Sequence, residues 1–320
     1  MTSTSSTVWI TGARGFIGQT LAAHCARNGR MICGLGHGAW PPTEAARTGM
    51  RHWLNGDVTG SNLQALWKIA GAPEVIYHLA GGSSVGAALA QPGEDFSRTV
   101  ASTAALLEWV RLAAPATRLV LASSAAVYGD RYSGAINEQM VPHPMSPYGF
   151  HKLMMEDLCR SYAANYGIAI LVARLFSVYG AGLRKQLLWD LCSRLAAGNA
   201  DIELGGNGQE MRDWVDVTDA ADVLIRVADL ANREVPVLNI GTGTGISVRA
   251  VAELIISIWL ESGSPERSLA FSGVSRRGDP RSLVADVSLL KSLGLACTTN
   301  VGSGMRRYVA WYRASAGKMS

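Results

Sequence analysis

The stretch Val8–Gly18, VWITGARGFIG, decides the fold because an apolar strand runs directly into a glycine-rich turn. A helical pattern follows it, and Met31–Leu35 forms a second apolar strand. Strand, glycine turn, helix and strand is the context in which such glycines indicate dinucleotide binding. Gly12 would permit the tight turn, Gly15 would let the backbone approach a pyrophosphate, and Gly18 would let helix and strand pack closely.

Apolar strands and helical patterns continue to alternate along the chain. Strands are expected at Val75–Ala80, Arg118–Ala122 and Ala169–Ala173, and helices at 100–111 and 148–165. This order predicts an α/β protein of the Rossmann type, with a doubly wound parallel sheet covered by helices on both faces. Ligands bind beyond the carboxyl ends of such strands, so the residues there should meet in one crevice. They are Gly12–Gly18, Gly81-Gly82, Ser124 and Ser177.

The pattern of the sequence changes after about residue 176, where the expected elements become shorter and the loops become rich in Gly and Arg. We therefore expect residues 1–176 to form the NAD(P)-binding Rossmann domain, with returning segments near 214–240. Residues 177–320 should form mainly a smaller C-terminal lobe that binds the substrate.

Composition excludes several classes of protein. The net charge of +4 is mild and no basic stripe is present, which argues against nucleic acid as a partner. The five cysteines are odd in number and lack metal-ligand spacing, so we expect free thiols and no metal. The N-terminus lacks the basic region of a signal peptide, and the apolar run Leu254–Leu260 is too short to cross a bilayer. A cytoplasmic protein without a membrane partner is expected.

Tyr148 and Lys152 lie four residues apart at the start of an expected helix, so they should share one helix face. A phenol is a poor base near neutral pH, but a neighbouring ammonium favours its phenolate form. Tyr148 could then accept a proton from a substrate hydroxyl while a nicotinamide accepts the hydride. A hydroxyl at Ser124 could hold the same substrate oxygen.

Taken in order, these motifs resemble the extended short-chain dehydrogenase/reductase family, in its nucleotide-sugar epimerase/dehydratase branch. The resemblance covers essentially the whole chain. It rests on TGARGFIG (11–18), GDV (56–58), HLAG (78–81), SSAAVYG (123–129), SPYGFHK (146–152), RLFSVYG (174–180), RDWVDV (212–217), NIGTG (239–243) and RRGD (276–279).

The resemblance implies a role for each motif. The catalytic residues would be Ser124, Tyr148 and Lys152. The cofactor, NAD, would be bound by Gly12, Arg14, Gly15, Phe16, Ile17, Gly18, Gly36, His37, Asp57, Val58, Leu79, Ala80, Gly81, Ala122, Ser123, Tyr148 and Lys152. A nucleotide-diphosphate sugar would be bound by Ser83, Ser124, Ser177, Lys185, Gln186, Arg212, Arg276 and Asp279. Relatives pair through the helices at 98–112 and 148–165, so a homodimer is also expected.

Two departures from the family pattern bear on the reaction. Dehydratases and decarboxylases of this family carry acidic residues directly after the catalytic hydroxyl residue, whereas this chain has Ala125-Ala126, which cannot transfer protons. This argues against 4,6-dehydration and decarboxylation. NAD-preferring members carry an aspartate after the second strand, where this chain has Gly36. Arg14 and His37 could instead face a 2′-phosphate, which keeps NADP as an alternative cofactor.

The sugar pocket also departs from the pattern of relatives. Ser83, Thr99 and Ser177 replace larger polar residues, and Arg184-Lys185-Gln186 could contact a carboxylated sugar. The leading hypothesis is a nucleotide-sugar 4-epimerase that oxidises C4 transiently with bound NAD. The alternative is a nucleotide 4-keto-(deoxy)sugar reductase that uses NADPH. His151 is expected on the helix surface.

Overall fold

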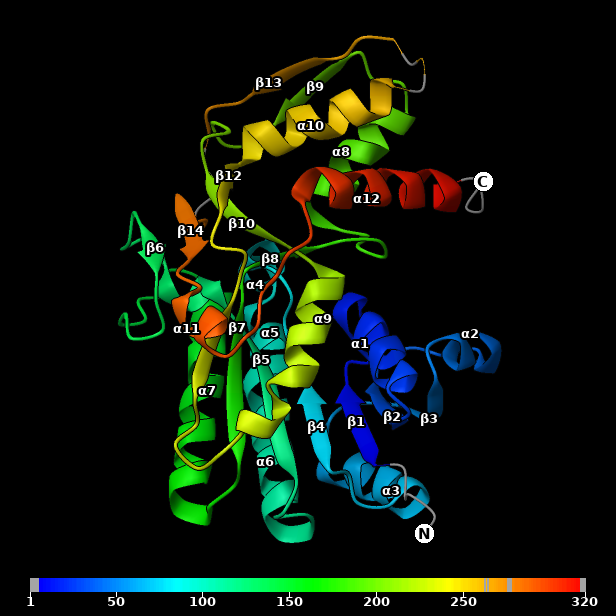
Figure 1. Cartoon of the computed structure of the whole chain (residues 1–320), viewed down its shortest axis with the longest axis vertical. Helices are drawn as coiled ribbons and strands as arrows, with labels where there is room; N and C mark the ends of the chain where they lie inside the picture. Colours follow the sequence, from blue (N-terminus) through cyan, green and yellow to red (C-terminus); the bar gives the residue numbers. More distant parts are fainter. Residues whose placement is uncertain (1–5, 262, 264, 275–277, 317–320) are drawn as a thin grey trace.

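The centre of the molecule is a parallel sheet of seven strands in the order β11-β7-β5-β4-β1-β2-β3 (Figure 1). The computed structural model describes residues 6–261, 263, 265–274 and 278–316. The strands are β1 (Thr7–Thr11), β2 (Met31–Gly36), β3 (Met50–Asn55), β4 (Val75–His78), β5 (Arg118–Ser124), β7 (Ile170–Leu175) and β11 (Val237–Ile240). Every neighbouring pair is parallel. The predicted fold class is confirmed.

Helices cover both faces of this sheet because side chains of successive strand residues point to opposite faces. Val8 and Ile10 of β1 belong to a core shared with α1 and α9, whereas Trp9 belongs to a core shared with α3, α6 and α7. The helices are α1 (Phe16–Arg27), α3 (Gly60–Ala70), α6 (Ser102–Ala113), α7 (Pro147–Tyr166) and α9 (Val217–Arg226). The sheet is therefore doubly wound.

Smaller elements lie beyond the carboxyl ends of the central strands (Figure 1). A second sheet has the order β12-β10-β14-β6, with β8 paired to β10, and β9 pairs with β13. These strands are β6 (Ala135–Ile136), β8 (Ser177–Tyr179), β9 (Asp201–Leu204), β10 (Met211–Asp216), β12 (Gly245–Ser247), β13 (Ser268–Phe271) and β14 (Ser282–Ala285). A third core joins α8 (Gln186–Ala196), α10 (Val248–Leu260) and α12 (Val301–Ala316).

Short helices complete the connections. They are α2 (Pro42–Arg47), α4 (Val85–Ala90), α5 (Pro92–Phe96), α11 (Ser288–Ser292), a π-helical turn η1 (Ser97–Ala101), and the 3₁₀ turns η2 (Ala125–Tyr128) and η3 (Ala228–Leu230). Across the described residues, no helix has the length and apolar character needed to cross a membrane.

Two features differ from the sequence-based expectation. The helix expected over 100–111 begins with the π-helical turn η1 and continues as α6 to Ala113. The third strand, β3, was not predicted, because Arg51 and His52 interrupt its apolar pattern. Pairing with β2 forms this strand, which shows tertiary context overriding local preference.

Candidate active site

One cavity of about 2780 Å³ lies at the carboxyl ends of the central strands. Pockets for a single small ligand are usually about 300–1000 Å³, so this cavity has room for two ligands side by side. Every predicted site residue that the structure describes lines it. Arg276 lies outside the described residues. The sequence thus predicted which segments meet here, although the roles of the individual residues remain predictions.

The glycine turn between β1 and α1 forms one end of the cavity. A side-chain carbon at Gly18 would lie 2.4 Å from the carbonyl oxygen of Gly12, so only glycine allows this close packing. Helix α1 begins at Phe16, and Gly15 at its N-cap offers no side-chain hydrogen bond. The first N–H groups of α1 are thus left for a ligand, and the helix dipole favours an anion there. This cradle fits the pyrophosphate of a dinucleotide.

The loop after β2 forms the outer edge of the same end. His37 Nε2 lies 2.8 Å from Asp57 Oδ1, and both side chains are exposed. The indole of Trp53 on β3 donates a hydrogen bond to the Gly38 carbonyl at 3.1 Å, and the Arg14 guanidinium lies against Gly38. Trp53 lines the cavity, but sequence reasoning missed this role because the strand carrying it was not predicted.

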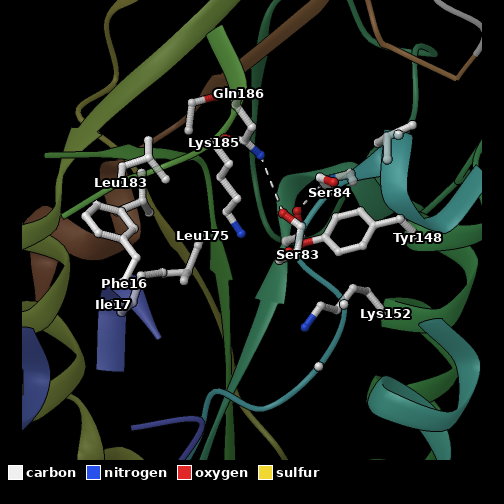
Figure 2. A pocket seen from close by; sticks show the side chains of 18 of the residues that line it. Phe16, Ile17, Ser83, Ser84, Tyr148, Lys152, Leu175, Leu183, Lys185 and Gln186 are labelled. Carbon is white, nitrogen blue, oxygen red and sulfur yellow. Dashed lines mark hydrogen bonds between the residues drawn. The ribbon is translucent and has the colours of Figure 1, made fainter. Parts of the chain in front are cut away.

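Helix α7 carries Tyr148 and Lys152 into the middle of the cavity (Figure 2). Ser146 caps this helix by accepting a hydrogen bond from Gly149 N at 3.3 Å, and Pro147 occupies the first turn. Lys152 is 4% exposed, and its Nζ donates to the Ala122 carbonyl at 2.8 Å. The same Nζ lies 5.9 Å from the centre of the Tyr148 ring.

The environment of this pair sets its protonation. The pKa of Tyr148 is raised above that of a free phenol, mainly by burial. A hydrogen bond with Ser124 lowers this pKa in part, and the nearby Asp95 carboxylate raises it. Burial lowers the pKa of Lys152 to about 8, against the opposing effect of Asp95 and Glu156. Lys152 therefore remains mainly an ammonium at neutral pH, where it can stabilise a Tyr148 phenolate.

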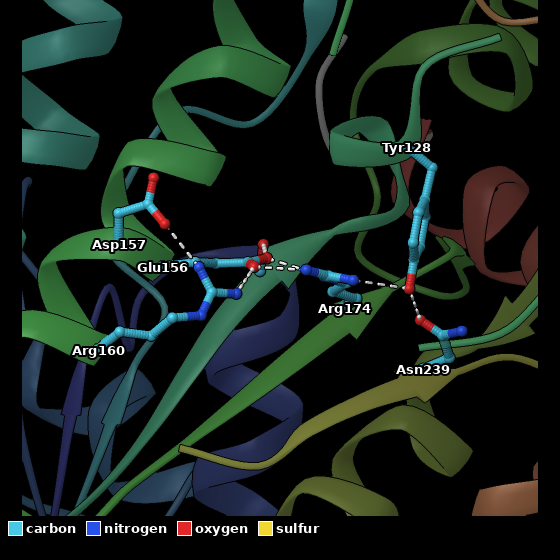
Figure 3. A network of polar contacts seen from close by, with 7 residues as sticks. Tyr128, Glu156, Asp157, Arg160, Arg174 and Asn239 are labelled. Carbon is cyan, nitrogen blue, oxygen red and sulfur yellow. Dashed lines mark hydrogen bonds and ion pairs between the residues drawn. The ribbon is translucent and has the colours of Figure 1, made fainter. Parts of the chain in front are cut away.

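A buried polar network holds α7 against the sheet one turn beyond Lys152 (Figure 3). Glu156 accepts from Arg174 Nη2 at 2.6 Å and from the Ser123 hydroxyl at 2.6 Å. Arg174 Nη1 donates to the Tyr128 hydroxyl at 2.9 Å, which donates to Asn239 at 2.8 Å. Ser123 is predicted to bind the cofactor, and its hydroxyl is engaged by Glu156.

Lys185 and Gln186 form the wall opposite Tyr148. Figure 2 shows Tyr148 and Lys185 entering the cavity from opposite sides. Partial desolvation lowers the pKa of Lys185. Gln186 has a positive φ of 63°, and its amide donates to the Ser83 carbonyl at 3.5 Å. An ammonium in this position can bind an anionic group of a ligand held near Tyr148.

Strand β10 brings Arg212 to the far end of the cavity. Burial lowers the pKa of Arg212, while Asp279, Glu210 and Asp130 act against that shift. The adjacent Asp213 is fully buried and accepts hydrogen bonds from the backbone of Thr242, Gly243 and Ala285 at 2.8, 2.9 and 3.2 Å. Asp213 thus fixes the loops around Arg212, a role that the sequence alone did not reveal.

The prediction for His151 was wrong. Its side chain is only 12% exposed, and Nδ1 lies 2.6 Å from Oδ2 of the buried Asp95. Ala125 and Ala126 line the cavity in the turn after Ser124. Within the described segments, no group of His, Cys, Asp and Glu is arranged to hold a metal ion.

Comparison with known proteins defines the class to which this fold and site belong. The model of the NAD dependent epimerase/dehydratase family matches residues 8–241, so the chain belongs to that family. The resemblance read from the motifs is therefore confirmed. UDP-glucose 4-epimerase of Streptomyces lividans is 28% identical over 292 residues, covering 86% of each chain.

Two solved structures are similar to this chain over nearly its whole length. MoeE5 in complex with UDP-glucuronic acid and NAD is 32% identical, covers 97% of this chain and 100% of its own, and superposes with a TM-score of 0.85. TunA, an NAD dependent NDP-hexosamine 5,6-dehydratase, is 26% identical, covers 97% and 98%, and has a TM-score of 0.81. Family membership alone therefore does not separate epimerases from dehydratases.

Proposed function

We propose that this protein is a nucleotide-sugar 4-epimerase that oxidises C4 transiently with a retained NAD. The observation that carries the proposal is the arrangement of Ser124, Tyr148 and Lys152 at the centre of a cavity whose two ends suit a dinucleotide and a nucleotide sugar. A related epimerase and a related structure that holds both a UDP-sugar and NAD support it.

The chain's own groups move the proton. Tyr148, as phenolate, accepts the proton of the C4 hydroxyl and returns it when the epimeric hydroxyl forms. Lys152 stabilises the phenolate by its charge, since it remains mainly an ammonium at neutral pH. Ser124, which hydrogen-bonds the Tyr148 hydroxyl, holds the substrate oxygen in line with it. Because the same tyrosine serves both directions, the protein returns to its starting protonation state.

NAD fits the cradle formed by the glycine turn and the start of α1. Gly12, Gly15 and Gly18 would hold its pyrophosphate, and Lys152 would also contact its nicotinamide ribose. When bound there, NAD supplies the acceptor and donor for the hydride at the substrate carbon. The leucine and alanine that line the cavity after β4, Leu79 and Ala80, would exclude water from this region.

The substrate class follows from the cations at the other end of the cavity. Arg212 at this end would bind the diphosphate, with Asp279 near the ribose. The family resemblance implies the same role for Arg276. Lys185 faces Tyr148, where the sugar ring must lie, so it would contact a group on the sugar itself. An ammonium there favours a sugar with a C6 carboxylate, and the UDP-glucuronic acid held by MoeE5 supports this choice.

The reactions that the catalytic turn disfavours are 4,6-dehydration and decarboxylation. Ala125 and Ala126, 2% and 8% exposed, follow Ser124 where family dehydratases carry acidic residues, and a methyl group cannot move a proton at C5 or C6. The alternative of a 4-keto-(deoxy)sugar reductase rests on Gly36, which offers no carboxylate to a ribose 2′-hydroxyl, and on Arg14 and His37, which would face the 2′-phosphate of NADPH.

Incubation of the purified protein with UDP-glucuronate, UDP-glucose or UDP-N-acetylglucosamine, without added cofactor, tests the proposal. Nuclear magnetic resonance of the products should show the C4 epimer, with UDP-glucuronate turned over fastest. A 4-keto or unsaturated product would contradict epimerisation. Turnover only after NADPH is added to a 4-keto sugar would favour the reductase.

A further inference from the structure

A buried acid and histidine lie directly beside the catalytic pair without belonging to it. Asp95 on α5 is 5% exposed, and its Oδ2 lies 2.6 Å from Nδ1 of His151. His151 lies on α7 between Tyr148 and Lys152 in sequence. The ring of Phe96 packs edge-on against the imidazole, with the ring centres 5.6 Å apart. These contacts fix both side chains of the pair.

The other carboxylate oxygen of Asp95 reaches the loop that forms the cavity wall. A side-chain carbon at Gly82 would lie 1.7 Å from Asp95 Oδ1, so glycine is required for this approach. Gly82 N donates to Thr99 Oγ1 at 2.8 Å, which fixes the loop from the other side. The preceding Gly81 lies against Lys152 Nζ, since a side-chain carbon there would be 3.3 Å from it. Asp95 thus contacts the loop that separates it from the catalytic lysine.

We propose that Asp95 is a positioning residue of the reaction, whose carboxylate, oriented by His151, supports the Gly81-Gly82 loop and acts through its charge on Tyr148 and Lys152. The inference rests on the proposed function, because it concerns the same proton transfer. The negative charge works in two directions: it keeps Lys152 charged and it opposes formation of the Tyr148 phenolate.

Among the other charged groups around Asp95, Glu156 also raises the pKa of Lys152, whereas the rest are paired or neutral. Helix α4 carries no titratable side chain, and on η1 Arg98 pairs with Glu94 at the exposed surface, 2.6 Å apart. On α7, Glu156 is engaged by Arg174. On β4, burial lowers the pKa of His78 to about 3, so this imidazole is neutral, and it lies between the hydroxyls of Thr11 and Thr103.

The test compares variants at position 95 with a variant of another histidine–carboxylate pair outside the cavity. Asp95→Asn and Asp95→Ser remove the charge, and Asp95→Glu retains it. His24→Gln is the control, because His24 Nδ1 also contacts a carboxylate, that of Asp222 at 2.5 Å, away from the cavity that holds Tyr148. The dependence of kcat/KM on pH is measured for the full-length protein with its bound dinucleotide, together with thermal unfolding.

Removal of the Asp95 charge lowers the pKa of both Tyr148 and Lys152, so both limbs of the profile should move to lower pH. A shift of about 0.5–1 pH unit is expected when one nearby charge is removed from the catalytic pair. Asp95→Glu should keep the wild-type limbs, and His24→Gln should leave the profile unchanged. Near-ultraviolet titration of the Tyr148 phenolate, read against Tyr148→Phe, should show the same shift without substrate.

Three results would overturn the inference. If a folded neutral variant has the same pH dependence of kcat/KM as the wild type, the charge of Asp95 does not affect the pKa of Tyr148 or Lys152. A shift of the same size in His24→Gln would show that the effect is not specific to the site. If both neutral variants unfold while Asp95→Glu stays folded, the role of Asp95 is to stabilise the fold. Failure of the proposed function is distinct, since the wild-type protein would then make no C4 epimer.

Discussion

Tyr148 is the residue on which the proposed chemistry depends, because its hydroxyl hydrogen-bonds with Ser124 and its ring centre lies 5.9 Å from Lys152 Nζ. Tyr148→Phe keeps the ring but removes the proton acceptor. We expect kcat to fall by about 10²–10⁴-fold with little change in the binding of the nucleotide sugar, as for the loss of a general base. Steady-state kinetics and calorimetric titration measure the two effects. A variant with wild-type turnover would remove Tyr148 from the mechanism.

The pKa of Lys152 leads to a prediction for kcat/KM at alkaline pH. Its pKa is lowered to about 8, so the ammonium that stabilises the phenolate is lost as the pH rises through that value. We expect kcat/KM to decline above about pH 8, with a slope of one proton. Lys152→Met, which carries no charge at any pH, should abolish this limb along with most of the activity. A profile that stays flat to about pH 10 would be incompatible with this role.

The position of Lys185 opposite Tyr148 leads to a prediction about substrate preference. Lys185→Met should raise KM for UDP-glucuronate about 10–100-fold, the usual loss for a hydrogen bond between charged groups. KM for UDP-glucose, which has no C6 carboxylate, should change less than about threefold. Lys68→Met on the exposed face of α3 serves as the matched loss of charge. Equal effects on both substrates would place Lys185 on the nucleotide instead of the sugar.

At the scale of elements, the network around Glu156 holds α7 to β5 and β7. Glu156 is fully buried and Arg174 is 2% exposed, so Glu156→Gln would leave Arg174 without a charged partner inside the protein. We expect the free energy of unfolding to fall by about 3 kcal/mol. The neighbouring Asp157→Asn, which breaks only the exposed pair with Arg160, should cost less than about 1 kcal/mol. Urea denaturation of both variants distinguishes a scaffold from a surface contact.

The elements also show what the sequence could reveal and where it could not. The glycine turn, the strand that ends at Ser124 and the start of α7 were predictable because each is marked by local signals: glycines, an apolar run, and Ser-Pro before a helix. The Asp95–His151 pair was not predictable, since it joins residues 56 positions apart, one of them on a helix of five residues. Strand β3 and Trp53 were missed because pairing with β2 outweighs a weak local pattern.

At the scale of the whole molecule, exposed apolar side chains on adjoining helices predict self-association. Phe96 on α5 and Phe150 and Met154 on α7 are 42%, 49% and 45% exposed. The family resemblance implies pairing through the helices at 98–112 and 148–165, and these exposed side chains on α5 and α7 add to the expectation of a homodimer. Light scattering should give twice the mass of one chain, and Met154→Glu should shift the protein toward the monomer. A monomeric wild-type protein at micromolar concentration would contradict this expectation.

The central claim is that the protein keeps NAD through turnover. The most direct measurement is to denature the freshly purified protein and identify the released dinucleotide by mass spectrometry. The proposal predicts NAD in near-stoichiometric amount, held by the glycine turn and α1. A protein that releases no dinucleotide and binds NADPH more tightly than NADH would contradict the claim, and would identify a ketosugar reductase instead.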